Sequence, residues 1–310
     1  MTTKIEWADM TINPVVGCSH CSPGCDHCYA ERFAARMAKN PNPKISGKYA
    51  GVVDEHGKWT GKTNITDHMD FSKLYGMRKS KRIFVGSMTD LFHVSVSIET
   101  LRDIFSSMSL CSQHTFMLLT KRPERMADFL REYFSTPLPN VWLGDTVCNQ
   151  AEADAKIPLL LQTPAAVRFV SVEPMLGPVD LGHLSWNIID STAEKNALTG
   201  KTWIQGNCGE SSQTLQGNRL DWVICGGETG PGARPMHPDW VRGLRDQCQA
   251  AGTPFFFKSW GEWWPGEWGR LYREKTISYA DGQDMVLIGK RRAGRLLDGV
   301  EHNEFPEVKA

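Results

Sequence analysis

Four cysteines lie within eleven residues near the start of the chain, in the segment GCSHCSPGCDHCYAERFAARM, residues 17–37. They are Cys18, Cys21, Cys25 and Cys28. Thiols at this spacing can form disulfides, hold one zinc ion or ligate an iron–sulfur cluster. The chain begins MTTKIEWADM, without an apolar signal segment, so we expect a cytoplasmic, reducing environment in which clustered thiols bind metal more often than they pair.

The spacing favours a four-iron cluster over a zinc ion. Cys21-x3-Cys25-x2-Cys28 supplies three thiolates from a tight loop, and Pro23 and Gly24 favour the turn that it needs. Three thiolates leave one iron open to a small molecule, whereas a fourth would close the cluster. One tetrahedral zinc held by all four cysteines stays an alternative, although zinc modules usually keep their two cysteine pairs farther apart.

The charge composition excludes a strong electrostatic field of one sign over the whole protein. Lys+Arg and Asp+Glu each number 35, so the formal net charge is zero and no global positive charge indicates a nucleic-acid binder. Two local basic runs remain, and each is either a solvated surface or a nucleic-acid contact. They are Arg78, Lys79, Lys81 and Arg82, and Lys290, Arg291, Arg292 and Arg295. No run of 18 apolar residues follows, so we expect no membrane segment.

Short apolar runs alternate with helical patterns along most of the chain. Seven runs predict strands, near 11–17 and at 82–87, 115–120, 140–144, 167–174, 221–227 and 254–260. Helices are predicted after the cysteines and at 97–110, 123–134, 150–161 and 238–252. Alternation of this kind is typical of parallel strands with helical crossovers. We expect an α/β fold, a full or partial (β/α) barrel, with a doubly wound sheet as the second choice.

The predicted barrel occupies residues 1–260 and is interrupted twice. Residues 40–75 read as an inserted hairpin or loop, and residues 182–220, rich in Gly, Ser, Asn and Thr, read as a partly irregular insertion. The C-terminal extension, 261–310, contains Trp263, Trp264 and Trp268 and short strand-like pieces. We expect it to pack across one end of the barrel.

Polar residues follow the predicted strands at the edge where barrels place their reactive centres. They are Ser87 and Asp90; Lys121 and Arg122; Thr146; Ser171 and Glu173; Gly226, Gly227 and Glu228; and Lys258. Any one of them could instead be a helix cap or an ion-pair partner, because strands commonly end in polar residues. Together they predict a ligand pocket.

The cysteine loop resembles the signature of radical S-adenosylmethionine (radical SAM) enzymes, in which an aromatic residue precedes the last cysteine; His27 takes that place. The whole chain is similar to a phage-associated bacterial family that is radical-SAM-like and marked by a three-cysteine motif. The motifs that carry this resemblance are WADMTINPVVGC, SPGCDHCYAERFA, MTDLFH, LLTKRPERM, VWLG, RFVSVEPMLGPV, WVICGGETGPGARPM, FFFKSWGE and AGRLLDG. That family has the pattern C-x6-C-x2-C, which falls on Cys18, Cys25 and Cys28 and leaves Cys21 as an extra thiol.

The resemblance implies a radical SAM type of barrel, a [4Fe-4S] cluster and S-adenosylmethionine as cofactors, and an external electron donor. Asp90 or Ser87 would receive the cofactor's ammonium, and Lys121 or Arg122 its carboxylate. Polar groups for the ribose would be Thr146, Ser171 and Glu173, with Gly226, Gly227 and Glu228 close to the cofactor. Glu173 and Lys258 are the catalytic candidates.

The substrate implied is a nucleic-acid base or nucleotide, from the phage association and the basic runs. Two other functions remain open on the sequence: a zinc-stapled nucleic-acid-binding protein without catalysis, and an electron carrier with a fully ligated cluster. The third iron ligand is Cys18 by the closer family and Cys21 by the general radical SAM spacing.

Overall fold

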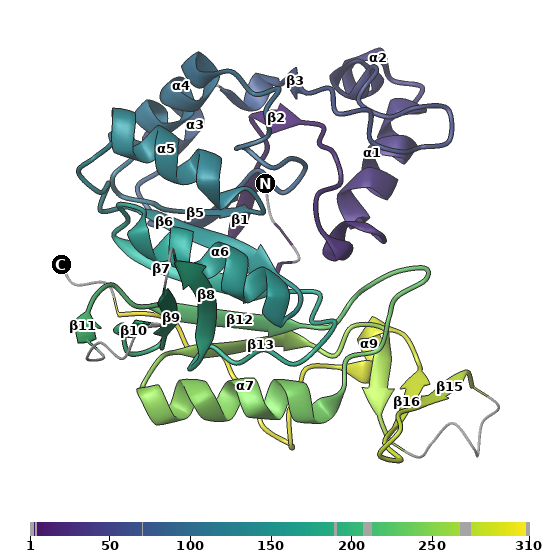
Figure 1. The fold of residues 1–310 in the computed structure, drawn as a ribbon. Coiled ribbons are helices and arrows are strands. Elements are labelled where there is room, and N and C mark those ends of the chain that lie inside the picture. Colours follow the sequence, from purple (N-terminus) through teal and green to yellow (C-terminus); the bar gives the residue numbers. More distant parts are fainter. Residues whose placement is uncertain are drawn as a thin grey trace. The chain divides into compact units, whose positions relative to one another are not determined.

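The computed structural model describes residues 3, 5–69, 71–188, 191–206, 213–266 and 274–307 and has a mixed α/β fold (Figure 1). It divides into unit 1, residues 1–145 and 163–166, and unit 2, residues 146–162 and 167–310. The helices are α1 (Tyr29–Ala38), α2 (Pro43–Ser46), α3 (Ser72–Tyr75), α4 (Ile98–Leu110), α5 (Pro123–Tyr133), α6 (Gln150–Gln162), α7 (Pro238–Ala251) and α9 (Lys290–Ala293), with 3-10 turns η1 (Pro23–Cys25), η2 (Gly47–Tyr49) and η3 (Asp67–Met69).

Seven strands form the main sheet, and they are the seven that the apolar runs predict. They are β1 (Met10–Ile12), β4 (Arg82–Val85), β5 (Thr115–Thr120), β6 (Val141–Val147), β7 (Val167–Val172), β12 (Trp222–Gly226) and β13 (Phe255–Ser259), in that order. The pairings within unit 1 and within unit 2 are parallel. These runs are almost wholly buried, which explains why they lack the alternation of a half-exposed strand.

The strand order decides between the two folds expected from the sequence. In unit 1 and in unit 2 alike, each strand of the sheet pairs with the sheet strand that comes before it along the chain, and each new strand is added on the same side. A doubly wound sheet reverses its direction at a switch point, so that alternative is wrong. Sequential parallel order with helical crossovers is the winding of a full or partial (β/α) barrel.

Helix α4 illustrates how local sequence builds unit 1. Ser97 is its N-cap, and its Oγ accepts a hydrogen bond from Thr100 N at 3.2 Å. The buried face packs an aromatic cluster in which Phe105 lies 5.2 Å from Phe129 and 6.2 Å from Phe92, centroid to centroid. This cluster fixes α4 and α5 together just behind the ends of β4 and β5.

In unit 2, helix α7 runs along β12 and β13 (Figure 1). His237 and Pro238 begin it, and it ends at Gly252, whose φ of 66° is the left-handed conformation expected of a terminating glycine. The described helices include none that is long and apolar enough to cross a membrane.

The first insertion, 40–75, contains the antiparallel pairing expected of a hairpin together with helical pieces. Strands β2 (Val15–Val16) and β3 (Asn64–Ile65) pair antiparallel, and a bridge joins Val53 to Trp59. Helices α2 and α3 and turns η2 and η3 are additions that the sequence pattern did not predict, because each is only three or four residues long.

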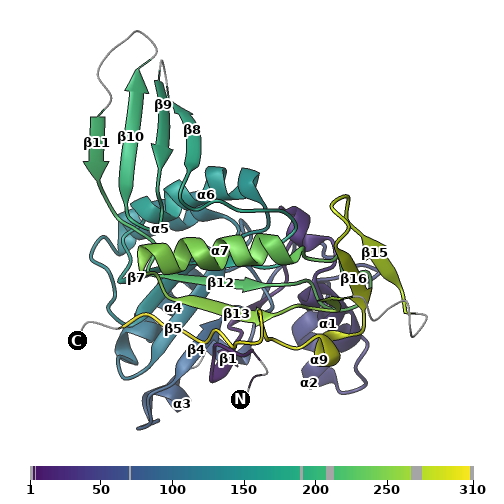
Figure 2. The ribbon, with the colours of Figure 1, turned by 90° about the horizontal axis from the view of Figure 1, so that it is seen from below.

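The insertion at 182–220, expected to be partly irregular, contains a regular sheet that the sequence did not predict. Four antiparallel strands lie side by side there, in the order β11-β10-β9-β8 (Figure 2). They are β8 (Leu184–Ile188), β9 (Ser191–Lys195), β10 (Lys201–Gly206) and β11 (Gln213–Gln216). Asn196 Oδ1 accepts hydrogen bonds from Leu198 N and Thr199 N, and Gly200 takes φ of 80°, which completes a turn between β9 and β10. Gly, Ser and Asn favour turns, so this insertion lacks a clear strand pattern in its sequence although Thr favours strands.

The C-terminal extension has a sheet of three antiparallel strands: β14 (Trp263–Pro265), β16 (Asp284–Leu287) and β15 (Thr276–Ser278). Trp263 and Met285 form a small core of their own with Ala233, whereas Trp268 lies outside the described residues. The last described segment runs along β13, where Phe257 N donates to His302 O at 3.0 Å. Within unit 2 the extension therefore covers the edge strand β13.

The turn between β9 and β10 allows a test of the second insertion. Leu198 is 1% exposed, whereas Leu215 on β11 is 50% exposed. We expect Leu198→Ala to lower the free energy of unfolding by about 2–4 kcal/mol, because it removes buried methyl groups and leaves a cavity. Leu215→Ala is the matched control and should change it by less than about 0.5 kcal/mol. Urea denaturation followed by circular dichroism measures both, and equal effects would contradict the burial of this turn.

Candidate functional site

The cysteine loop lies in unit 1 between β2 and α1. Its central turn is η1, where Ser22 Oγ accepts a hydrogen bond from Gly24 N at 3.1 Å. Cys28 is the N-cap of α1, so its thiol sits at the positive end of that helix. Cys21 is exposed, and Cys18, Cys25 and Cys28 are partly buried. The predicted loop-then-helix arrangement is therefore present.

Hydrogen bonds fasten the start of this loop to the carboxyl end of β4. Gly17 N donates to Met88 O at 3.1 Å, and Thr89 Oγ1 donates to Gly17 O at 2.6 Å. Gly17 has φ of 103°, and a Cβ there would stand 2.2 Å from the carbonyl oxygen of Lys62. Only glycine fits, so the residue directly before Cys18 is fixed against both β4 and the first insertion.

The other end of the loop is fastened at the same place. Tyr29 directly follows Cys28, and its OH donates to Ser87 O at 2.6 Å. Ser87 Oγ in turn donates to Asn13 Oδ1 at 3.1 Å, which follows β1. Ser87, a predicted ligand for the cofactor's ammonium, thus lies at the loop, with its carbonyl and its hydroxyl both in these bonds.

Asp90 joins the ends of β4 and β5. Its Oδ1 accepts from Phe92 N at 3.0 Å and Thr120 Oγ1 at 2.7 Å. Its Oδ2 accepts from Lys121 N at 2.9 Å and Arg122 Nη1 at 2.8 Å. Asp90 is 7% exposed, and four donors engage its carboxylate. An ammonium would compete with those donors, so the geometry favours Asp90 as the residue that positions Lys121 and Arg122.

Arg122 connects this carboxylate to the cysteine loop. Its Nη2 donates to both Ser19 O and Ser19 Oγ at 3.1 Å, and its Nη1 lies 4.0 Å from Cys18 Sγ. Ser19 Oγ also lies 2.7 Å from His93 Nε2. Burial and the nearby Arg122 lower the pKa of His93, so this imidazole is neutral at pH 7. Ser19 and His93 were not among the predicted site residues, although His93 belongs to the same MTDLFH segment as Asp90.

The thiols face the two cations at the end of β5. Cys21 hydrogen-bonds to the Cys25 sulfur, which raises the pKa of Cys21 and lowers that of Cys25 to about 5. Burial raises the pKa of Cys18, and Asp90 adds to that effect while Arg122 opposes it. Burial lowers the pKa of Lys121, but the charges of Cys25, Asp90, Cys28 and Cys21 outweigh it, and the net shift is upward. Cations this close stabilise thiolates and suit an anionic ligand.

Sulfur spacing bears on the choice between a cluster and zinc. Two thiolates on one tetrahedral zinc stand about 3.8 Å apart, from a Zn–S bond of about 2.3 Å. In the described part of the chain no three cysteine sulfurs lie within 4.8 Å of one another. A four-iron cluster asks for wider spacing, because each thiolate binds its own iron. The described sulfurs therefore do not form a ready-made site for one shared zinc ion.

A buried carboxylate on α1 ties the cysteine loop to the first insertion. Glu31 is 2% exposed; its Oε1 accepts from Trp59 N at 2.8 Å, and its Oε2 lies 3.1 Å from Lys58 Nζ. His20 Nε2, inside the cysteine loop, lies 3.0 Å from Glu31 Oε1. Sequence analysis missed this residue, because a single Glu on a helix carries no distinctive signal.

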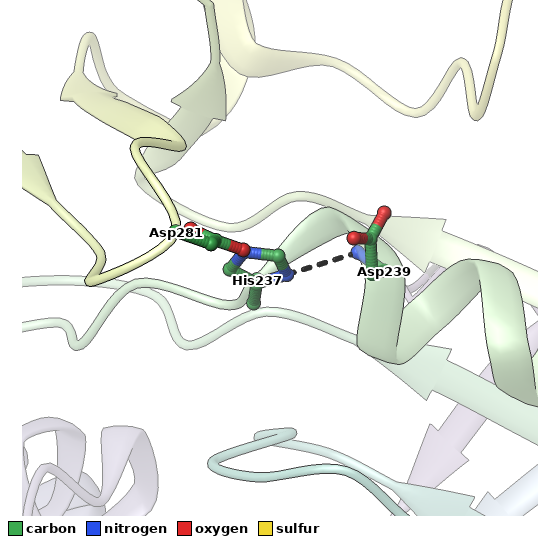
Figure 3. A group of neighbouring side chains, drawn as sticks. All are labelled: His237, Asp239 and Asp281. Atoms are coloured by element: carbon green, nitrogen blue, oxygen red, sulfur yellow. Dashed lines mark hydrogen bonds and ion pairs between the residues drawn. The ribbon is translucent and has the colours of Figure 1, made fainter.

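A group of possible metal ligands lies in unit 2, where Figure 3 shows His237 between Asp239 and Asp281. His237 Nδ1 accepts a hydrogen bond from Asp239 N at 3.1 Å, so the proton of the neutral ring is on Nε2, which faces Asp281 Oδ2 at 2.9 Å. A metal ligand would need the reverse, with Nδ1–H donating and Nε2 free. The group is a His–Asp pair that joins the start of α7 to the β15–β16 turn.

The predicted residues of unit 2 form two groups at the ends of β7, β12 and β13. Glu173 and Lys258 form a short, partly buried ion pair, and a Cβ on Gly226 would come within 3.3 Å of Lys258 Cβ and 3.5 Å of Glu173 Cδ. The catalytic candidates thus lie together, with Gly226 beneath them. Gly227 packs against the Trp260 backbone, where a Cβ would meet its carbonyl oxygen at 2.0 Å.

Glu228 is a buried clamp. Its Oε2 accepts from Arg234 N at 2.7 Å and Arg234 Nε at 2.9 Å, and its Oε1 accepts from Nη2 at 2.7 Å. These bonds close the loop GETGPGAR on itself, so Glu228 has a structural role here. Thr146 and Ser171, the proposed ribose contacts, are buried in β6 and β7.

The four bonds to Asp90 generate a test of its positioning role. We expect Asp90→Asn to lower the free energy of unfolding by about 3–5 kcal/mol, because it leaves the largely buried Arg122 without its charge partner. Asp103→Asn on the exposed face of α4 is the matched control and should have an effect within about 0.5 kcal/mol. Chemical denaturation measures both; a stable Asp90→Asn protein would mean that Asp90 is free to serve a ligand.

Comparison with known proteins gives a family and no named function. No curated protein and no solved structure matches the chain. One family model matches residues 2–306, nearly the whole length, and its description is "Protein of unknown function (DUF5131)". The chain with this cysteine loop and this pair of cations therefore belongs to the DUF5131 family.

Proposed function

We propose that this protein is a radical SAM enzyme that holds a [4Fe-4S] cluster in its cysteine loop. One observation carries the proposal: the loop is fastened at the carboxyl ends of β1 and β4, next to Lys121 and Arg122 at the end of β5. Barrels place their chemistry at that edge. The resemblance of the loop to the radical SAM signature agrees with this location.

The cysteine loop supplies thiolates, and its surroundings favour Cys18 as the third ligand. Gly17 is fixed to β4, Gly61 N donates to Cys18 O at 3.1 Å, and Arg122 holds Ser19. The backbone on both sides of Cys18 is therefore anchored, whereas Cys21 is exposed. Cys18, Cys25 and Cys28 would ligate three irons, with Cys21 outside the ligand set.

Lys121 and Arg122 would serve the carboxylate of S-adenosylmethionine. Lys121 is the better candidate, because Arg122 already donates to Asp90 and Ser19, whereas Lys121 uses its backbone N–H toward Asp90 and keeps its ammonium for the cysteine side. When bound and reduced, such a cluster would supply the one electron that splits S-adenosylmethionine into methionine and a 5′-deoxyadenosyl radical, and this radical would abstract hydrogen from a substrate. We propose a nucleic-acid base or nucleotide as that substrate and an external electron donor.

Single cysteine variants test the ligand set. We expect Cys18→Ser, Cys25→Ser and Cys28→Ser to lose the absorbance near about 400 nm that thiolate-bound clusters give after anaerobic reconstitution. Cys21→Ser, the control inside the same loop, should keep it together with its iron content. Loss at Cys21 but not at Cys18 would reverse the assignment of the third ligand. Loss in all four, or zinc in place of iron, would favour the electron carrier or the zinc-stapled protein instead.

Cleavage of the cofactor tests the enzyme itself. Reconstituted protein with dithionite and S-adenosylmethionine should yield 5′-deoxyadenosine by mass spectrometry, and Cys25→Ser should yield none. Lys121→Ala should keep its iron and lower the yield by about tenfold or more, because one charge-assisted contact to the cofactor is lost. A cluster that forms but neither cleaves S-adenosylmethionine nor changes its spectrum with it would contradict the proposal.

A further inference from the structure

A concentrated basic surface precedes β4 in unit 1. Residues 72–82, SKLYGMRKSKR, carry five cations and no acidic residue. We call this stretch, which includes α3, the basic segment. Arg82 lies 3.8 Å from Asp9, Nε to Oδ2. The other four cations make no ion pair within the described part of the chain, and they are Lys73, Arg78, Lys79 and Lys81. The segment therefore presents uncompensated positive charge to solvent.

The backbone of the segment is anchored to neighbouring residues, although most of its cations are exposed. Leu74 and Phe71 are 6% exposed, and the Phe71 ring packs 6.0 Å from Phe116 of β5. Gln113 Nε2 lies within hydrogen-bond distance of three carbonyls of the segment, those of Leu74 and Tyr75 at 3.1 Å and that of Met77 at 3.3 Å. The cations are thus mounted on a fixed backbone, which reduces the entropy lost when a ligand binds.

An exposed aromatic ring lies among these cations. Tyr75 is 66% exposed at the end of α3, and Met77 beside it is 37% exposed. An isolated exposed ring is unremarkable, but a ring flanked by Lys73, Arg78 and Lys79 combines a stacking platform with phosphate-binding charge. Proteins that bind single-stranded nucleic acid without sequence preference use this combination.

We infer that the basic segment is a docking surface for single-stranded nucleic acid. Arg78, Lys79, Lys81 and Lys73 contact phosphates, and Tyr75 stacks on one base. A membrane surface fits less well, since Leu74 and Phe71 point into the core and Tyr75 and Met77 alone make a small apolar face.

The position of the segment separates it from the reaction edge. It leads into the amino end of β4, whereas the cysteine loop is fastened at the carboxyl end of the same strand. The surface therefore retains a polymer and takes no part in the chemistry at the other end. This inference goes beyond the proposed function, because binding is measured without cluster chemistry and stands or fails independently.

The test uses the purified full chain and a fluorescein-labelled oligothymidylate of about 20 nucleotides, longer than one such site covers. Fluorescence anisotropy measures the affinity between about 0.05 and 0.2 M salt. Over this range the affinity falls with salt in proportion to the number of phosphate contacts. We expect the double variant Arg78→Glu/Lys79→Glu to bind at least about tenfold more weakly and to lower the slope of log affinity against log salt by about 1.4, for two lost phosphate contacts. Tyr75→Ala should weaken binding about tenfold without changing that slope, and Tyr75→Phe should restore it.

Lys39→Glu/Lys44→Glu is the matched control. Both lysines are exposed cations of unit 1 outside the segment, so the pair changes the net charge equally and should leave the affinity within about twofold. An equal loss in this control would overturn the inference, because the effect would then be one of net charge. Absence of oligonucleotide binding by the wild-type chain, or binding to phosphatidylserine vesicles instead that Arg78→Glu/Lys79→Glu abolishes, would overturn it as well.

Discussion

The candidate site in unit 1 depends on the hydrogen bonds that the Asp90 carboxylate accepts. Its four hydrogen bonds join the end of β4 to the end of β5 and orient the Arg122 guanidinium. Arg122 then reaches Ser19, one residue past Cys18. Since a guanidinium is planar and donates along fixed directions, the position of Asp90 determines where the cysteine loop can rest. Asp90 and Arg122 thus connect the ends of the strands to the cysteine loop.

More charged groups surround these four thiols than surround a cysteine that is simply packed in a core. Two cations and one buried carboxylate lie around four thiols, and Cys28 lies at the N-terminus of α1. The two cations and the start of α1 favour negative charge on sulfur, whereas burial and Asp90 raise the pKa of Cys18. The proposed thiolate ligands would gain most from these cations when they are ionised.

Unit 2 shows how glycine is used where chain segments must approach closely. Gly226 leaves room for Glu173 and Lys258 to meet above it, and Gly227 lets β12's end touch the Trp260 backbone. Glu228 and Arg234 close the following loop. The sequence predicts that these residues bind a ligand. In the structure, however, Glu228 accepts its hydrogen bonds from Arg234 of the same loop. Glu173 and Lys258 differ from Glu228 in that their ion pair joins the ends of two strands and stays partly exposed.

The sequence by itself determined the seven strands, the main helices and the cysteine loop, because burial on both faces gives continuous apolar runs and because the thiol spacing is short-range. It did not determine the strand order, which follows from tertiary packing and excludes the doubly wound sheet. The sheet at residues 182–220 was not predicted, since Gly and Asn weaken a local strand pattern and the strands form once neighbours pair with them. Likewise only the tertiary structure assigned Asp90, Ser19 and His93 their partners, because each bond joins residues about 30 to 100 positions apart, a separation at which no local pattern exists.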